Sequence, residues 1–171
     1  FQKRVQGVGV IEPKVAVEYG LSGPMIRSCG IRWDLRRQDP YSIYDRFEFE
    51  IPVYESCDVW ARYMVRRREM AESARIVEQA LAQLPAGDIM AKVPKNIKPP
   101  AGQIYCRTES PRGELGFYLI SDGSPKPYRY KVRSPAYVNL SAVPEMLRGC
   151  LVADLVAVLG SVDIVLGEVD R

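Results

Sequence analysis

The sequence contains no histidine. Within this chain, that excludes Ser-His-Asp and Cys-His catalysis and every metal site that needs an imidazole ligand. The cysteines are widely scattered and form no Cys-x-x-Cys pair, which argues against a Cys₄ zinc site or a clustered iron–sulfur motif. We expect them to be free thiols in a reducing cytoplasm. The four are Cys29, Cys57, Cys106 and Cys150.

Long apolar runs are also missing. The most apolar stretch, residues 151–167, is interrupted by Asp154 and Asp163, so we expect no membrane span. No basic segment followed by an apolar one opens the chain, so no signal peptide is expected; the first residue, Phe1, suggests a processed or truncated piece. The net charge is only +3, from 24 basic and 21 acidic residues, and gives no indication of nucleic-acid binding.

A glycine-rich loop occupies residues 20–30, where three glycines and a proline surround Arg27. This composition predicts a tight loop, a short helix from Pro24 and a stop at Gly30. Glycines let a backbone approach another group closely, so the loop could serve a site. A simple connector is an equally good interpretation of the composition.

A strand and a long helix are predicted next. Residues 46–53 alternate charged and apolar side chains, which is typical of a half-exposed strand. Residues 58–84 contain no proline or glycine, and apolar residues recur mostly at spacings of three and four. This pattern predicts an amphipathic helix about 40 Å long. The run Arg66, Arg67 and Arg68 on this helix could bind phosphate, but we expect it to be solvated or paired with Glu69 and Glu72.

The pattern becomes β after a proline-rich connector at residues 92–102, which divides the chain into segments 1–91 and 103–171. Residues 103–110, 114–121 and 127–133 are predicted strands. The third strand places three cations on one face, about 7 Å apart. These cations are Arg129, Lys131 and Arg133. They form either a surface for an anion or an acidic partner, or an ordinary solvent-exposed face of the sheet.

The remaining segments supply no independent catalytic site. Glu109 and Glu114 flank a predicted turn, and we expect them to be surface glutamates rather than an acid–base pair. A helix opens at Pro144, and a further one over residues 151–159 is predicted to stop at Gly160. From the residues alone, we expect an α+β domain that provides binding surfaces rather than catalytic groups.

Several sequence blocks occur together in a fixed order. They are GVGVI (7–11), GLSGPMIR (20–27), WDLR (33–36) and PY (40–41); RYMVR (62–66) and EM (69–70); ESPRGELG (109–116), SDG (121–123) and PYRYKVR (127–133); and GSVDIVLGEVDR (160–171). Together they closely resemble the C-terminal part of the D-type subunit, the 49 kDa subunit in mitochondria, of respiratory complex I. The resemblance covers essentially the whole chain.

This resemblance implies the fold of the large subunit of [NiFe] hydrogenases, with a long helix from a bundle and a small antiparallel sheet. Residues 111–115 resemble the hydrogenase strand motif. Hydrogenases hold nickel with two Cys-x-x-Cys pairs, the second near the C-terminus. The corresponding residues 167–171 contain no thiolate here, so we expect no metal in this part of the site.

The resemblance also implies a function: a subunit of a proton-translocating NADH-quinone oxidoreductase at the cytoplasmic face of the cell membrane, peripheral to it. The chain would help to form the quinone pocket beside the terminal iron–sulfur cluster of a neighbouring subunit, with quinone as substrate and no cofactor of its own. Expected partners are that iron–sulfur subunit, the C-type subunit and the membrane subunit of the quinone channel. In the family, the histidine and tyrosine that contact the quinone lie in the N-terminal half, so we expect a C-terminal fragment that is inactive alone.

Site residues are implied by the same resemblance. Asp163, Val165, Glu168 and Arg171 would line or buttress the quinone pocket, with Val165 as an apolar wall and the two carboxylates as proton suppliers or anchors for basic partners. A supporting loop is expected around the same pocket, formed by Gly23, Arg27 and Gly30. The candidates for subunit contacts are Arg129, Lys131 and Arg133.

Alternatives remain open. The chain could act mainly as an assembly module that holds neighbouring subunits. The short segment 88–100 suggests a compact bacterial or archaeal branch, in which ferredoxin or a deazaflavin could replace NADH as electron donor. A nickel-binding hydrogenase is the alternative with the least support.

Overall fold

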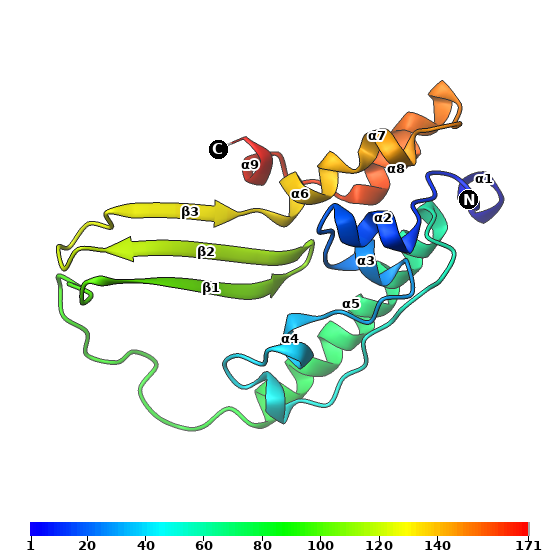
Figure 1. The fold of residues 1–171 in the computed structure, drawn as a ribbon. Coiled ribbons are helices and arrows are strands. Elements are labelled where there is room, and N and C mark those ends of the chain that lie inside the picture. The colour runs from blue at the N-terminus through cyan, green and yellow to red at the C-terminus, as the bar shows by residue number, and fades with distance from the viewer. Residues whose placement is uncertain (171) are drawn as a thin grey trace.

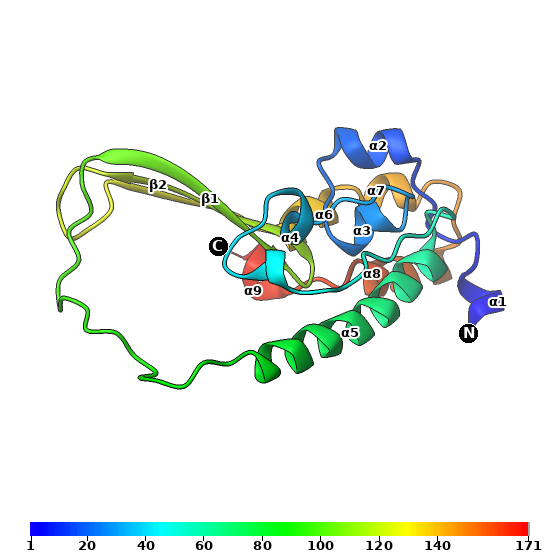
Figure 2. The same ribbon diagram turned by 90° about the horizontal axis from the view of Figure 1, so that it is seen from below.

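The computed structural model of the chain describes residues 1–170. Short helices, one long helix and a three-stranded antiparallel sheet confirm the predicted α+β class. The sheet extends to one side of the helices, and the segment after the long helix α5 runs round to the far end of the sheet (Figures 1 and 2). The elements are α1 (Gln2–Val5), α2 (Pro13–Glu18), α3 (Pro24–Arg27), α4 (Leu35–Gln38), the 3₁₀ turn η1 (Tyr44–Arg46), α5 (Val59–Ala82), β1 (Gly102–Ser110), β2 (Gly113–Ser121), β3 (Arg129–Arg133), α6 (Pro135–Ser141), α7 (Val143–Met146), the 3₁₀ turn η2 (Val152–Asp154), α8 (Leu155–Val162) and α9 (Leu166–Val169).

The main core joins both ends of the described chain. It collects buried side chains from α2, α3, the start of α5, α7 and α8, among them Ala16, Met25, Val59, Met146 and Val158. Burying one of these valine or methionine side chains contributes about 1.5–3 kcal/mol. Because the contributors come from residues 5 to 162, the N-terminal and C-terminal segments stabilise each other.

A buried arginine ties α5 to this core. Asp58 caps the helix, and Arg62 in its first turn is fully buried. The Arg62 guanidinium donates to Ser161 Oγ at 2.8 Å, to the Cys57 carbonyl at 3.0 Å and to the Gly9 carbonyl at 2.9 Å. Since these acceptors are neutral, burial dominates and lowers the pKa of Arg62 to about 10. One side chain thus joins the N-terminal segment, α5 and α8.

The long helix is confirmed, but most of the apolar stripe predicted along it is not buried. At 24 residues, α5 is about 36 Å long. Its buried residues all lie in the first two turns and are Val59, Ala61, Arg62 and Val65. Three residues of the predicted stripe farther along stay exposed, so this part of the stripe has no bundle partner within residues 1–170. They are Met70, Val77 and Leu81.

The strand predicted at residues 46–53 is wrong. This segment is extended, but it pairs with no strand in the described chain. Its backbone bonds to side chains of α5 instead: Glu48 N donates to Gln79 Oε1 at 2.8 Å, and Gln79 Nε2 returns a bond to the Glu48 carbonyl at 2.7 Å. The alternation in the sequence corresponds to burial, because three alternate side chains of this segment pack against the second half of α5. They are Phe47, Phe49 and Ile51.

The three later strands are confirmed, in the order β1-β2-β3. The predicted stop at Gly160 is wrong, because α8 continues to Val162 and ends where Asp163 adopts the left-handed conformation (φ 58°, ψ 52°).

All four cysteines are free thiols. Among the described helices, none has both the length and the apolarity needed to cross a bilayer.

Candidate functional site

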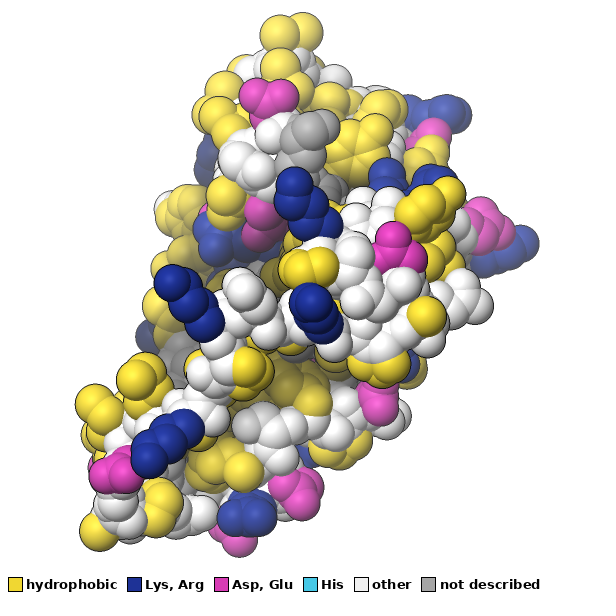
Figure 3. Space-filling view, turned by 90° about the vertical axis from the view of Figure 1, so that its left-hand side faces the viewer, with side chains coloured by type: hydrophobic (Ala, Val, Ile, Leu, Met, Phe, Trp, Pro, Cys, Tyr) yellow, Lys and Arg dark blue, Asp and Glu magenta, His cyan; other side chains and the backbone are white. Residues whose placement is uncertain are grey.

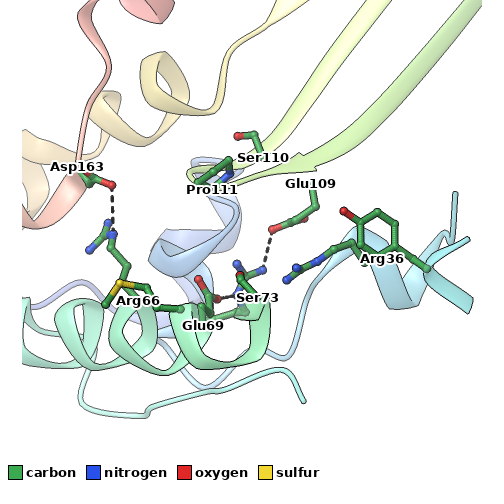
Figure 4. A pocket seen from close by; sticks show the side chains of 11 residues that line it. Arg36, Arg66, Glu69, Ser73, Glu109, Ser110, Pro111 and Asp163 are labelled. Atoms are coloured by element: carbon green, nitrogen blue, oxygen red, sulfur yellow. Dashed lines mark hydrogen bonds and ion pairs between the residues drawn. The ribbon is translucent and has the colours of Figure 1, made fainter. Parts of the chain in front are cut away.

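A cavity of about 560 Å³ lies where α5, α3, the β1–β2 turn and the end of α8 meet. Figure 4 shows Asp163 and Arg66 pointing toward each other at one end of it, with Glu69 and Glu109 farther along. Charged side chains of both signs dominate the lining. The lining residues are Arg27, Arg36, Tyr44, Arg66, Glu69, Met70, Ser73, Glu109, Ser110, Pro111 and Asp163.

Asp163 is held at the cavity by two arginines. Its carboxylate lies 3.7 Å from Arg66 Nε and 3.3 Å from Arg112 Nη2, and Arg112 Nε donates to its backbone carbonyl at 3.0 Å. The left-handed backbone turns this residue out of α8, and its side chain stays partly exposed. The carboxylate is therefore fixed in position and still open to an occupant of the cavity.

A buried charge network forms the opposite wall. Arg27 is 1% exposed; its Nε donates to Glu69 Oε1 at 2.6 Å, and its Nη1 donates to Glu109 Oε1 at 2.8 Å. Asp34 lies 3.5 Å from the same Nη1 and also binds Arg36 at 2.6 Å. Burial by itself would lower the pKa of Arg27, but the three carboxylates outweigh it and the pKa is raised. The guanidinium is thus permanently charged.

The two glutamates of this network respond in the other direction. Burial raises the pKa of Glu69 and of Glu109, and the attraction of Arg27 only partly offsets that effect. Both side chains also line the cavity. They are therefore carboxyl groups that can take up and release a proton closer to neutral pH than an exposed glutamate.

Two glycines bring the β1–β2 turn to this place. At Gly23 (φ 65°), a Cβ would lie 2.6 Å from Gly113 Cα, and at Gly113 (φ 128°) a Cβ would lie 2.7 Å from the Ser22 carbonyl carbon. The backbones of the loop and the turn touch because neither position carries a side chain. This contact carries Pro111 and Arg112 to the cavity.

The structure brings together only some of the predicted site residues. Asp163 and Arg27 line the same cavity, and Gly23 supports it from behind. Val165 and Glu168 do not line it; the Glu168 carboxylate instead accepts bonds from Ser134 Oγ and Ala136 N, both at 3.2 Å, and so anchors the tail to α6.

The remaining two predicted residues are Gly30 and Arg171. Gly30 (φ 80°) has its amide bonded to the Tyr54 carbonyl, away from the cavity. Arg171 lies outside the described residues.

Several cavity residues were not anticipated. Glu109 was expected at the surface, but only 3% of its side chain is exposed. Arg66 was expected to be solvated or paired with a glutamate of its own helix, but it faces Asp163, and burial lowers its pKa while Asp163 opposes that effect. A signal was available: a cation in a loop as apolar as that around Arg27 needs carboxylate partners when the loop is buried.

The predicted cationic face is present on β3. Residues 129, 131 and 133 alternate on one side of the strand, but they differ in use. Arg133 donates to the carbonyls of Glu114 and Gly20, at 2.7 and 2.8 Å, while Lys131 remains exposed. Within the described part of the chain, no group of three or more His, Cys, Asp or Glu side chains is arranged to hold a metal ion.

Comparison with known proteins assigns this α+β chain, with its charged cavity, to a family. The family described as "Respiratory-chain NADH dehydrogenase, 49 Kd subunit" matches residues 1–100 and 91–171. Proteins named as the D subunit of NADH-quinone oxidoreductase are 57% identical in Dehalococcoides mccartyi, over 98% of this chain and 46% of that protein, and 52% identical in Bacillus mycoides, over 99% and 47%. The chain belongs to this family, which confirms the resemblance, and spans about half the length of these relatives.

Proposed function

We propose that this chain forms one wall of the quinone-binding pocket in a proton-translocating NADH-quinone oxidoreductase. The observation that carries the proposal is the cavity in which Asp163, held by Arg66 and Arg112, faces the buried network of Arg27. Its volume of about 560 Å³ lies in the range of small-molecule sites. The names of the relatives support NADH as the donor and a quinone as the acceptor.

The residues present suit the chemistry of quinone reduction, which takes two electrons and two protons. The electrons would arrive from an iron–sulfur cluster in a neighbouring subunit, since this chain is proposed to bind no cofactor. Arg66 at the cavity would stabilise negative charge that develops on a quinone oxygen. Glu69 and Glu109, with raised pKa values, are groups that can hold protons beside it.

The finer parts of the proposal concern fold, location and the tail. We place the fold with the hydrogenase large subunits and the complex at the cytoplasmic face of the membrane, with the iron–sulfur subunit, the C-type subunit and the membrane quinone-channel subunit as neighbours. Val165, Glu168 and Arg171 would complete the pocket from the tail, on the side where Glu168 is anchored to α6. Ferredoxin or a deazaflavin remains the alternative donor.

The test replaces one carboxylate in the full-length subunit within the intact complex. Asp163→Asn keeps the shape of the side chain but removes its charge, so it should lower quinone reductase activity about tenfold or more, equivalent to about 1.4 kcal/mol of barrier. Electron transfer from NADH to an artificial acceptor that bypasses quinone should not change. Asp88→Asn, at an exposed position after α5, is the matched control and should leave both activities intact. Unchanged quinone reduction in Asp163→Asn would refute this use of the cavity.

A further inference from the structure

A second cleft, of about 620 Å³, lies between the sheet and α6 and shares no lining residue with the cavity beside Asp163. It is rich in tyrosine and carries two cations. The side chains and backbone that line it come from Tyr105, Tyr118, Tyr130, Lys131, Val132, Arg133, Ser134, Tyr137, Val138 and Val169. The charged cavity described above makes no use of any of them.

The floor of this cleft is a row of residues across all three strands. Tyr105 is paired with Tyr118, and Tyr118 with Lys131, so the three side chains stand on one face of the sheet. The hydroxyl of Tyr105 donates to Glu114 at 2.9 Å and that of Tyr118 to Gln103 at 2.7 Å. These bonds fix the rings in place before anything binds, which lowers the entropy lost on association.

Gly116 makes room for this arrangement. A Cβ at this position would overlap the hydroxyl end of Tyr105, so only glycine lets the ring lie across the neighbouring strand. The tyrosine floor therefore depends on a specific small residue beneath it.

The cations of this face are not equally available. Arg133 is bound to two backbone carbonyls and lies 3.8 Å from the Glu114 carboxylate, so it is part of the structure. The Lys131 side chain makes no hydrogen bond or ion pair to any of residues 1–170, although it stands on the same face of the sheet beside Tyr118. An exposed, uncompensated ammonium group in an aromatic cleft is complementary to a carboxylate.

The composition of the cleft favours a protein as the occupant. Tyrosine and arginine are enriched at the centres of protein–protein interfaces, and Tyr137, 60% exposed, stands at the edge of this cleft beside Val138 and Val169. A nucleic acid needs several cations along its phosphates. Figure 3, which faces the end of the sheet, shows Lys and Arg side chains standing apart between apolar and uncharged surface, not as one continuous basic stripe.

We infer that this cleft binds an acidic segment of a neighbouring subunit, with a carboxylate on Lys131 and adjacent side chains on the tyrosine rings. The inference rests on the proposed function only in requiring a multisubunit complex. Of the three cations predicted to contact a neighbouring subunit, the inference retains only Lys131. Arg133 is already bound to backbone carbonyls, and Arg129 does not line the cleft.

The first experiment identifies the occupant. A photoreactive phenylalanine analogue replaces Tyr137 in the full-length subunit, and the purified, assembled complex is irradiated and analysed by mass spectrometry. The expected product joins Tyr137 to a peptide of another subunit that contains Asp or Glu. The same analogue at Lys126, in the turn between β2 and β3, is the control and should not give that product. No product, or a product with lipid, nucleic acid or this same chain, would overturn the inference.

The second experiment tests the charge. Lys131→Glu should lower the affinity of the subunit for the complex about tenfold, seen as release at lower salt on native gels, and Lys126→Glu should not. Reversing the acidic residue found in the crosslinked peptide to lysine should restore assembly of Lys131→Glu. If Lys131→Glu assembles like Lys126→Glu, the inference is wrong, whereas the test of the quinone pocket at Asp163 is unaffected, because it is read from quinone reduction by assembled complexes.

Discussion

Replacing Arg27 by methionine is expected to destabilise the full-length protein by about 3–5 kcal/mol, because it leaves buried carboxylates without their counter-ion. The side chain is 2% exposed and donates to Glu69 at 2.6 Å and to Glu109 at 2.8 Å. Each hydrogen bond to a charged group contributes about 1.5–3 kcal/mol, so the two together account for the expected loss. Urea unfolding measured at neutral pH gives the free-energy difference directly.

A double-mutant cycle separates the charge effect from lost packing. Glu109→Gln should be more favourable in the Arg27→Met variant, where it removes an unpaired buried charge, than in the wild type, where it also weakens a bond to Arg27. Arg32→Met is the control, because Arg32 is exposed and its loss should change stability by no more than about 0.5 kcal/mol. Equal costs of Glu109→Gln in both backgrounds, or an Arg27→Met loss no larger than that of Arg32→Met, would refute the network.

Two further predictions concern the loop contact and the pH dependence. Gly113→Ala should destabilise by about 2 kcal/mol or more, since it combines a positive φ with a clash against Ser22, whereas Gly123→Ala, with φ 89° and open space, should cost about 1 kcal/mol by the same unfolding measurement. The raised pKa of Glu109 means that the folded state binds a proton more readily than the unfolded state, whose value is near 4.5. Wild-type stability relative to Glu109→Gln should therefore rise as pH falls from 7 toward 4.5, and a fall over that range would contradict the assignment.

The local elements were predictable because their signals are local. Period-two alternation and turn residues identified all three strands, and the absence of proline and glycine identified α5. Alternation also described residues 46–53 correctly as half-buried, but it could not reveal the partner. A strand needs backbone groups opposite its own, and here the side chain of Gln79 supplies them, which no pattern within the segment indicates.

The cavity was harder to predict because its charges pair over long sequence separations. Arg27 and Glu109 are 82 positions apart, and Glu109 alone has the composition of an ordinary surface glutamate next to a turn. Asp163 was singled out by resemblance, yet its partner Arg112 lies 51 positions earlier. Pairing of this kind depends on the contact between Gly23 and Gly113, which exists only in the folded chain.

The absence of histidine takes on a specific meaning once these positions are known. Without imidazole, the cavity offers carboxyl groups with a raised pKa for proton exchange closer to neutral pH than an exposed glutamate allows. Burial raises the pKa of Glu69 and of Glu109, and Arg27 keeps both in position rather than allowing either to turn to solvent. Since both line the cavity that Asp163 faces, the proposed proton exchange with an occupant would need no histidine from this chain.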